Sequence, residues 1–106
     1  MIIVFASKNH LGLNSDIGSS IVSSEYFTVA EIENGKLKKV KNVENPFFKE
    51  EKINTQKFID FIKNTNAQKI VVSAVDNADI ENELLLNHIE VIKNVNGRIA
   101  DILKEL

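Results

Sequence analysis

Two runs of apolar residues dominate the pattern along this chain. Residues 1–6 are uninterrupted apolar and end at Ser7, which is typical of a strand buried on both faces. Residues 70–75 are almost wholly apolar as well, and they predict a second central strand. Residues 88–92 predict a further, short strand near the end of the chain.

Residues 26–33 and 36–44 are predicted to form a β-hairpin. Asn34-Gly35 separates them, and Asn-Gly favours a type I′ turn because both turn positions need positive φ. A two-residue turn fixes the register of the strands. The expected cross-strand pairs are Glu33 with Lys36, Ile32 with Leu37, Glu31 with Lys38 and Val29 with Val40.

Four lysines gather in the second strand of this hairpin: Lys36, Lys38, Lys39 and Lys41. Such charge suits the edge of a sheet, where it discourages pairing with another chain. A phosphate-binding strip is the alternative interpretation, although glutamates on the partner strand would cancel much of its field.

Helical periodicity begins after Asn54, a good N-cap for a helix over 55–64 that places Phe58, Phe61 and Ile62 on one face. Before it, Asn45-Pro46 ends the preceding strand. Phe47-Phe48 then either covers one end of the core or forms an exposed partner patch.

Two further helices are expected downstream. Asp76 is the expected N-cap of the first, which buries Ile80 and Leu84 and ends at Asn87 in a left-handed conformation. The last begins at Asn94 or Asn96, and its apolar positions repeat at helical spacing: Ile99, Ile102, Leu103 and Leu106.

The order of these elements predicts a three-layer α/β fold. Strands that alternate with helices in the second half imply parallel pairing and right-handed crossovers, whereas the hairpin adds an antiparallel part. The expected sheet is mixed and five-stranded, with order 3-2-1-4-5 and three helices. The 106 residues fit a single domain, 1–106.

Composition narrows the function classes. A net charge of -2 gives no basic field for nucleic acid, and no apolar run reaches the length that spans a bilayer. Cysteine is absent, so thiolate catalysis, disulfides and cysteine-ligated metals are excluded. Since the N-terminus does not read as a signal peptide, we expect a cytoplasmic protein with no membrane or nucleic-acid partner.

A ligand site is expected where the strand order reverses, beyond the carboxyl ends of the first and fourth strands. The loops 7–24 and 73–78 meet there and contain the candidate ligand-binding residues Ser7, Asn9, His10, Ser19, Ser20, Ser73, Asp76 and Asn77. The alternative is that these residues only cap helices and satisfy loop backbone, because Ser, Asn and Asp are turn formers.

Motifs of common enzymes are missing. The chain has no phosphate-binding loop, no dinucleotide fingerprint and no nucleophile elbow. His10 and His88 are the only imidazoles. His10, in the loop, is the better metal ligand candidate, with a solvated loop histidine as the alternative, whereas His88 is expected to be structural. We therefore expect a protein that is not an enzyme.

With this layout, the sequence resembles the NifX-type family of dinitrogenase iron–molybdenum cofactor biosynthesis. The matching pieces are Ile2-Ile3-Val4-Phe5-Ala6-Ser7, Tyr26-Phe27-Thr28-Val29, Val43-Glu44-Asn45-Pro46, Asn77-Ala78 and Ile89-Glu90-Val91-Ile92. The resemblance implies a ribonuclease-H-like fold and a non-catalytic role in carrying or holding iron–sulfur or iron–molybdenum clusters. Nucleases of that fold need a metal-binding acid on the first strand, and this strand has none.

The chain departs from this family at two places. The segment His-Phe-Gly-Arg-Ala, typical of the family before the second strand, reads Ser20-Ile21-Val22-Ser23-Ser24. The glycine-rich turn after the fourth strand reads Val75-Asp76. The leading hypothesis is a small binding domain of metallocofactor handling, and the alternative is an interaction module that has lost cofactor binding and holds a partner protein.

Overall fold

A computed structural model describes residues 1–18, 20–21, 23–48, 52–75 and 77–106. Its elements follow in the order β1 (Ile2–Ser7), the 3-10 turn η1 (Gly12–Asn14), β2 (Tyr26–Glu33), β3 (Lys36–Glu44), α1 (Thr55–Lys63), β4 (Lys69–Val71), α2 (Ala78–Leu86), β5 (Glu90–Ile92) and α3 (Ile99–Leu103). The strands form one sheet in the order β3-β2-β1-β4-β5. β1 is antiparallel to β2 and parallel to β4, which confirms the predicted mixed α/β fold.

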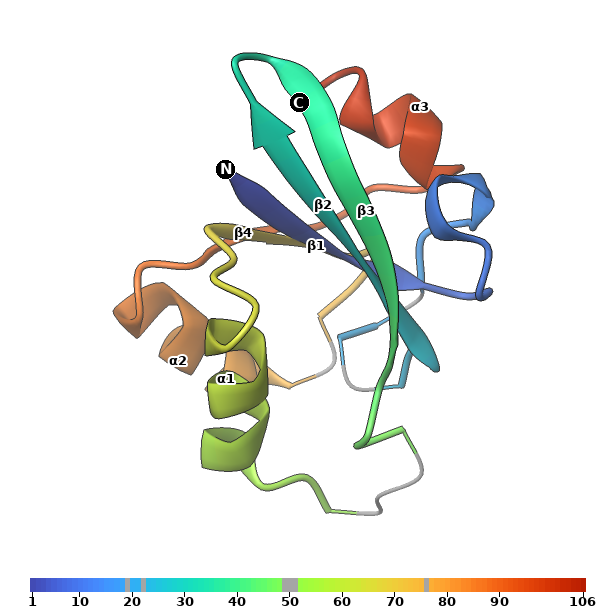
Figure 1. Ribbon diagram of the computed structural model, residues 1–106. Coiled ribbons are helices and arrows are strands. Elements are labelled where there is room, and N and C mark those ends of the chain that lie inside the picture. The colour runs from blue at the N-terminus through green and yellow to red at the C-terminus, as the bar shows by residue number, and fades with distance from the viewer. Residues whose placement is uncertain (19, 22, 49–51, 76) are drawn as a thin grey trace.

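Helices cover the sheet from both sides, as Figure 1 shows. α1 and α2 lie on one face, whereas α3 and η1 lie on the other. β1 alternates between these layers: Val4 and Ala6 belong to the core under α1 and α2, and Ile3 and Phe5 to the core under α3. The uninterrupted apolar run of β1 thus reflects burial on both faces, as predicted.

The start of α1 is as expected from the sequence. The Asn54 side chain accepts a hydrogen bond from the backbone N–H of Lys57 at 3.0 Å, which caps the helix. Phe58, Ile59 and Ile62 are buried. The ring of Phe58 packs at 5.6 Å from that of Phe47, centroid to centroid. Phe47 therefore covers the core, whereas its neighbour Phe48 is 37% exposed.

Both ends of α2 differ from the prediction. Asn77 occupies the N-cap and accepts a hydrogen bond from Ile80 N–H at 3.1 Å, while the expected cap, Asp76, lies outside the described residues. At the other end, Asn87 has φ of -94° and is not left-handed. His88 takes that conformation instead, with φ of 62°, so β5 begins only at Glu90. Histidine is one of the residues that tolerates this region.

The last third of the chain is less regular than its apolar spacing indicates. β4 contains three residues rather than the six of the run 70–75. α3 contains five residues, and its N-cap is Arg98, without a side-chain capping bond, rather than Asn94 or Asn96. Across the described ranges, each helix falls short of what crossing a bilayer requires.

A β-bulge changes the register of the hairpin. Glu33 pairs with Lys36 and Ile32 with Leu37, as predicted, but the register shifts between Glu31 and Ile32. Beyond the shift, Glu31 pairs with Lys39, Ala30 with Val40 and Val29 with Lys41, so the predicted pairs Glu31–Lys38 and Val29–Val40 are wrong. Lys38 is the extra residue, since a bulge sets two residues of one strand against one of the other. Its ammonium instead lies 2.9 Å from the Glu33 carboxylate.

Candidate functional site

The ends of β1 and β4 lie side by side, where the predicted site was placed. Gly18, from the loop after β1, connects them through its backbone. Its N–H donates to the Ala6 carbonyl at 2.5 Å, and its carbonyl accepts from Ser73 N–H at 3.1 Å. A Cβ at Gly18 would overlap the Ser24 hydroxyl and approach the Ala6 carbonyl carbon to 3.1 Å. Glycine is needed here for close packing of backbone against backbone.

The serines of the first loop use their hydroxyls inside the protein. Ser7 is fully buried, and its Oγ lies 2.7 Å from Thr28 Oγ1 in a shared hydrogen bond. Ser20 Oγ accepts from Ser23 N–H at 2.9 Å, and the Ser20 carbonyl accepts from the Ser24 hydroxyl. Ser7 is thus bonded to β2, and Ser20 satisfies polar groups of its own loop.

The second loop shows the same behaviour. Ser73 donates its hydroxyl to Asn96 Oδ1 at 2.8 Å, and Asn77 caps α2. Two other candidates, Ser19 and Asp76, lie outside the described residues. The four surface hollows that the structure describes are lined by residues other than Ser7, Ser20, Ser73 and Asn77.

Asn9 and His10 are exposed at the start of the first loop. The Asn9 carbonyl accepts from the Ser15 hydroxyl at 2.8 Å. The His10 ring packs edge-on against Tyr26, with centroids 4.8 Å apart. The charge of Glu25 raises the pKa of the Tyr26 phenol above its usual 10.0, because a phenolate would be repelled.

The donors for a metal are sparse. Among the described residues, no three His, Cys, Asp or Glu side chains come together in a group that could hold a metal ion. His10 faces an aromatic ring rather than another donor. The described loops therefore do not present the thiolate and imidazole set on which iron clusters depend.

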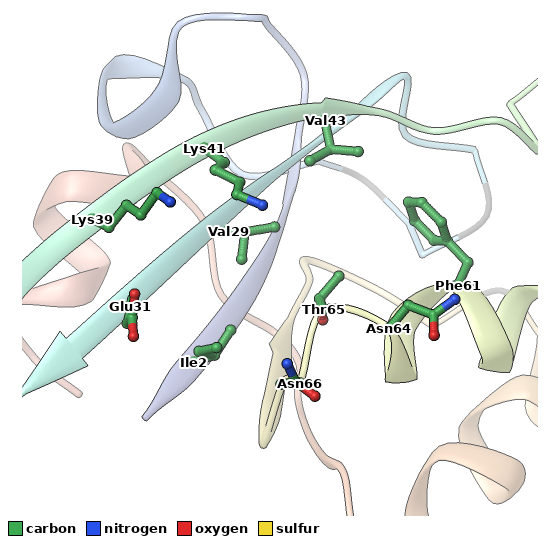
Figure 2. A pocket seen from close by; sticks show the side chains of 10 residues that line it. All are labelled: Ile2, Val29, Glu31, Lys39, Lys41, Val43, Phe61, Asn64, Thr65 and Asn66. Atoms are coloured by element: carbon green, nitrogen blue, oxygen red, sulfur yellow. The ribbon is translucent and has the colours of Figure 1, made fainter.

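Hollows of the surface lie elsewhere and are lined by residues other than the predicted site residues. One of about 410 Å³ lies between β2, β3 and the C-terminal end of α1. Figure 2 shows the side chains that line it. Another, of about 620 Å³, lies between the tip of the hairpin and α3. The lysine-rich pattern of residues 36–44 was the sequence signal for the hollow between β2, β3 and α1. Which of these lysines face the hollow depends on the strand register, and the bulge changes that register.

Comparison with known proteins relates the fold to solved structures. No family model matches the sequence, and no curated protein matches it. A protein designated PH0822 superposes with a TM-score of 0.84 at 25% identity, over 98% of this chain and 86% of that one.

Two further structures share the fold. A Thermotoga protein proposed to be a NifB protein, of the DUF35 family, has a TM-score of 0.77 at 17% identity, over 97% of this chain and 84% of that one. A Methanocaldococcus jannaschii protein proposed to be a dinitrogenase has a TM-score of 0.62 at 15% identity, over 99% of this chain and 89% of that one. These structures and the present chain thus share one fold over nearly their whole lengths.

Proposed function

We propose that this protein is a non-catalytic binding domain that takes part in handling a metallocofactor. The observation that carries the proposal is the shared fold: the chain superposes almost completely on two proteins whose names refer to NifB and to dinitrogenase. Fold alone does not determine function. The resemblance of the sequence to the NifX-type family, found independently of those structures, supports the same interpretation.

The donor set limits how such a domain would hold its cargo. The chain has no cysteine, and His10 is the imidazole of the loop that follows β1. These residues do not fit a cluster that is permanently ligated by this chain. The proposal therefore concerns a cluster as transient cargo, touched through the exposed His10 while other ligands come from a partner.

The test is anaerobic incubation of the purified protein with an iron–sulfur or iron–molybdenum cluster, followed by desalting. The proposal expects a retained chromophore at well below one cluster per chain. It also expects His10→Asn to abolish the retention, because that variant removes the loop imidazole. His88→Asn is the matched control. His88 is exposed and lies between α2 and β5, outside the loop that follows β1, and Asn also tolerates its positive φ. Absence of any retained chromophore, or equal loss in both variants, would contradict the proposal.

A second candidate function is an interaction module that binds a partner and no cofactor. Apolar side chains on the surface favour it: Leu86 on α2 is 72% exposed, and Leu85 beside it is 52% exposed. The open edge of β3 and the exposed Phe48 offer further contact. Affinity capture from native lysate, with Leu86→Lys as the competing bait, tests this function. Recovery of the same partners by both baits would count against α2 as the contact surface.

A further inference from the structure

We propose that the hollow between the β2–β3 hairpin and α1 binds a small organic anion with an apolar body, such as an aromatic or branched aliphatic carboxylate. We name it the lysine groove, and its lining residues are Ile2, Val29, Glu31, Lys39, Lys41, Val43, Phe61, Asn64, Thr65 and Asn66. This inference does not rest on the proposed function, since His10 and the loops after β1 and β4 do not line the groove.

The floor and one wall of the groove are apolar. Val29 and Val43 come from neighbouring strands of the hairpin and are half-buried, and Phe61 faces them from α1 (Figure 2). Phe61 is fixed by other rings, with centroids 5.9 Å from Phe27 and 6.0 Å from Phe47. A preformed apolar wall of this kind favours a ligand with an aromatic or branched body.

The rim of the groove is cationic because of the β-bulge. In the regular register, Val40 would lie opposite Val29 on this face. The bulge moves Lys41 to that position and Val40 opposite Ala30, on the face that α3 covers. Lys39 lies on the groove side as well, opposite Glu31. One extra residue in β3 thus replaces an aliphatic side chain over the groove by an ammonium group.

Four polar side chains of the rim have no partner within the part of the chain that the structure describes. Lys39 and Lys41 make no ion pair with another described residue, whereas the neighbouring Lys38 is paired with Glu33. The side-chain amides of Asn64 and Asn66 likewise make no hydrogen bond there. Thr65 differs, since its hydroxyl donates to the Ile62 carbonyl at 2.6 Å and shapes the turn after α1.

The charge balance identifies the sign of the ligand. Two ammonium groups and one carboxylate give the lining a net charge of one positive unit. Lys39 has Glu31 as its cross-strand neighbour, but Lys41 lies opposite an apolar residue. Lys41 is therefore the main anchor for a carboxylate, with the Asn64 and Asn66 amides as further donors, while Glu31 opposes the anion. The volume of about 410 Å³ lies in the range of pockets for small metabolites.

The test is a titration of the ¹⁵N-labelled protein with phenylacetate, followed by amide chemical shifts. We expect shifts clustered at Val29, Lys41, Phe61 and Asn66. Phenylacetamide, which is neutral, should bind at least about fivefold more weakly, because it loses the charge-assisted bonds. Inorganic phosphate alone should give no comparable cluster. Equal binding of phenylacetamide, equal effects of phosphate, or no clustered shifts would each overturn the proposal.

Two substitutions at the rim should change the affinity for phenylacetate in opposite directions. Lys41→Met should weaken phenylacetate binding about tenfold, which corresponds to about 1.4 kcal/mol of affinity. Glu31→Gln should tighten it, since it removes the opposing carboxylate. Lys38→Met is the matched control: it removes the same charge from the same strand outside the groove, and it should leave affinity unchanged. An unchanged affinity in Lys41→Met, or the same loss in Lys38→Met, would overturn the assignment.

Discussion

Two polar regions of this molecule use their side chains in opposite ways. We call residues 7–24 and 73–78 the strand-end loops, and they are rich in Ser and Asn. The side chains of Ser7, Ser73 and Asn77 nevertheless form their hydrogen bonds with other groups of the protein. The lysine groove contains fewer polar residues, yet Lys41 and Asn66 have no described partner. A dense run of polar residues therefore indicates a folded loop as readily as a ligand site, and unpartnered groups around a hollow are the more informative feature.

Among substitutions in these two regions, Gly18→Ala is expected to change the stability of the protein most. The added Cβ would overlap the Ser24 hydroxyl and press against the backbone of Ala6, in the loop after β1 whose backbone also bonds to Ser73 after β4. We expect a loss of about 2–3 kcal/mol in the free energy of unfolding, because overpacking at a rigid site is not easily relieved. Urea denaturation followed by circular dichroism measures it. Asn9→Ala in the same loop is the control, since the Asn9 side chain is exposed, and it should change stability little.

A smaller loss is expected when the buried pair of hydroxyls is broken. Ser7→Ala leaves Thr28 Oγ1 without its partner at a fully buried position, which should cost about 1–2 kcal/mol. Thr28→Val should cost a similar amount for the same reason. In the double variant the two losses should not add, because neither hydroxyl is then left unpaired. Strict additivity of the three values in denaturation experiments would show that the pair is not a stabilising unit.

The Asn77 cap should contribute less than the buried pair. Asn77→Ala removes the acceptor for Ile80 N–H and should lower the free energy of unfolding by about 1 kcal/mol. Asn54→Ala provides a matched comparison, because Asn54 caps α1 with the same geometry. Similar losses in both variants support a capping role for Asn77. A variant of Asn77 that is as stable as the parent protein would mean that its side chain does not serve α2.

Most of the fold could be predicted from the sequence, because burial determines the pattern along the strands. The Asn34-Gly35 turn predicted the hairpin, and the apolar runs 1–6 and 70–75, with the strands and helices that alternate in the second half, predicted the strand order. The bulge was not predictable, since opposite charges at Glu31 and Lys38 fit the regular register equally well. The predicted caps Asn94 and Asn96 were wrong because both bond to Ser73, a distant part of the chain: the Asn94 N–H donates to the Ser73 carbonyl, and Asn96 Oδ1 accepts from the Ser73 hydroxyl.

The candidate site shows the same limit. The sequence predicted that Ser7 and Ser73 follow neighbouring strands. The parallel pairing of β1 with β4 confirms that these strands are adjacent. It could not tell that Ser7 would bond to Thr28 or that His10 would pack against Tyr26, since both partners come from β2. Whether these residues bind a ligand stays a prediction. The groove was not predicted because its residues come from β1, β2, β3 and α1 with its following turn, and the bulge decides which β3 side chains face it.

The smallest effect is expected from the groove itself. Lys41→Met should change the free energy of unfolding by less than about 0.5 kcal/mol, because the ammonium group is exposed and has no described partner to lose. Lys38→Met, which breaks the exposed pair with Glu33, should also stay within about 1 kcal/mol. Thermal and urea denaturation measure both. A large destabilisation by Lys41→Met would place this lysine with the internally satisfied groups of the strand-end loops, and the contrast between the two regions would disappear. A neutral result leaves its charge free to act on a ligand, because a residue that the fold does not need is available for binding.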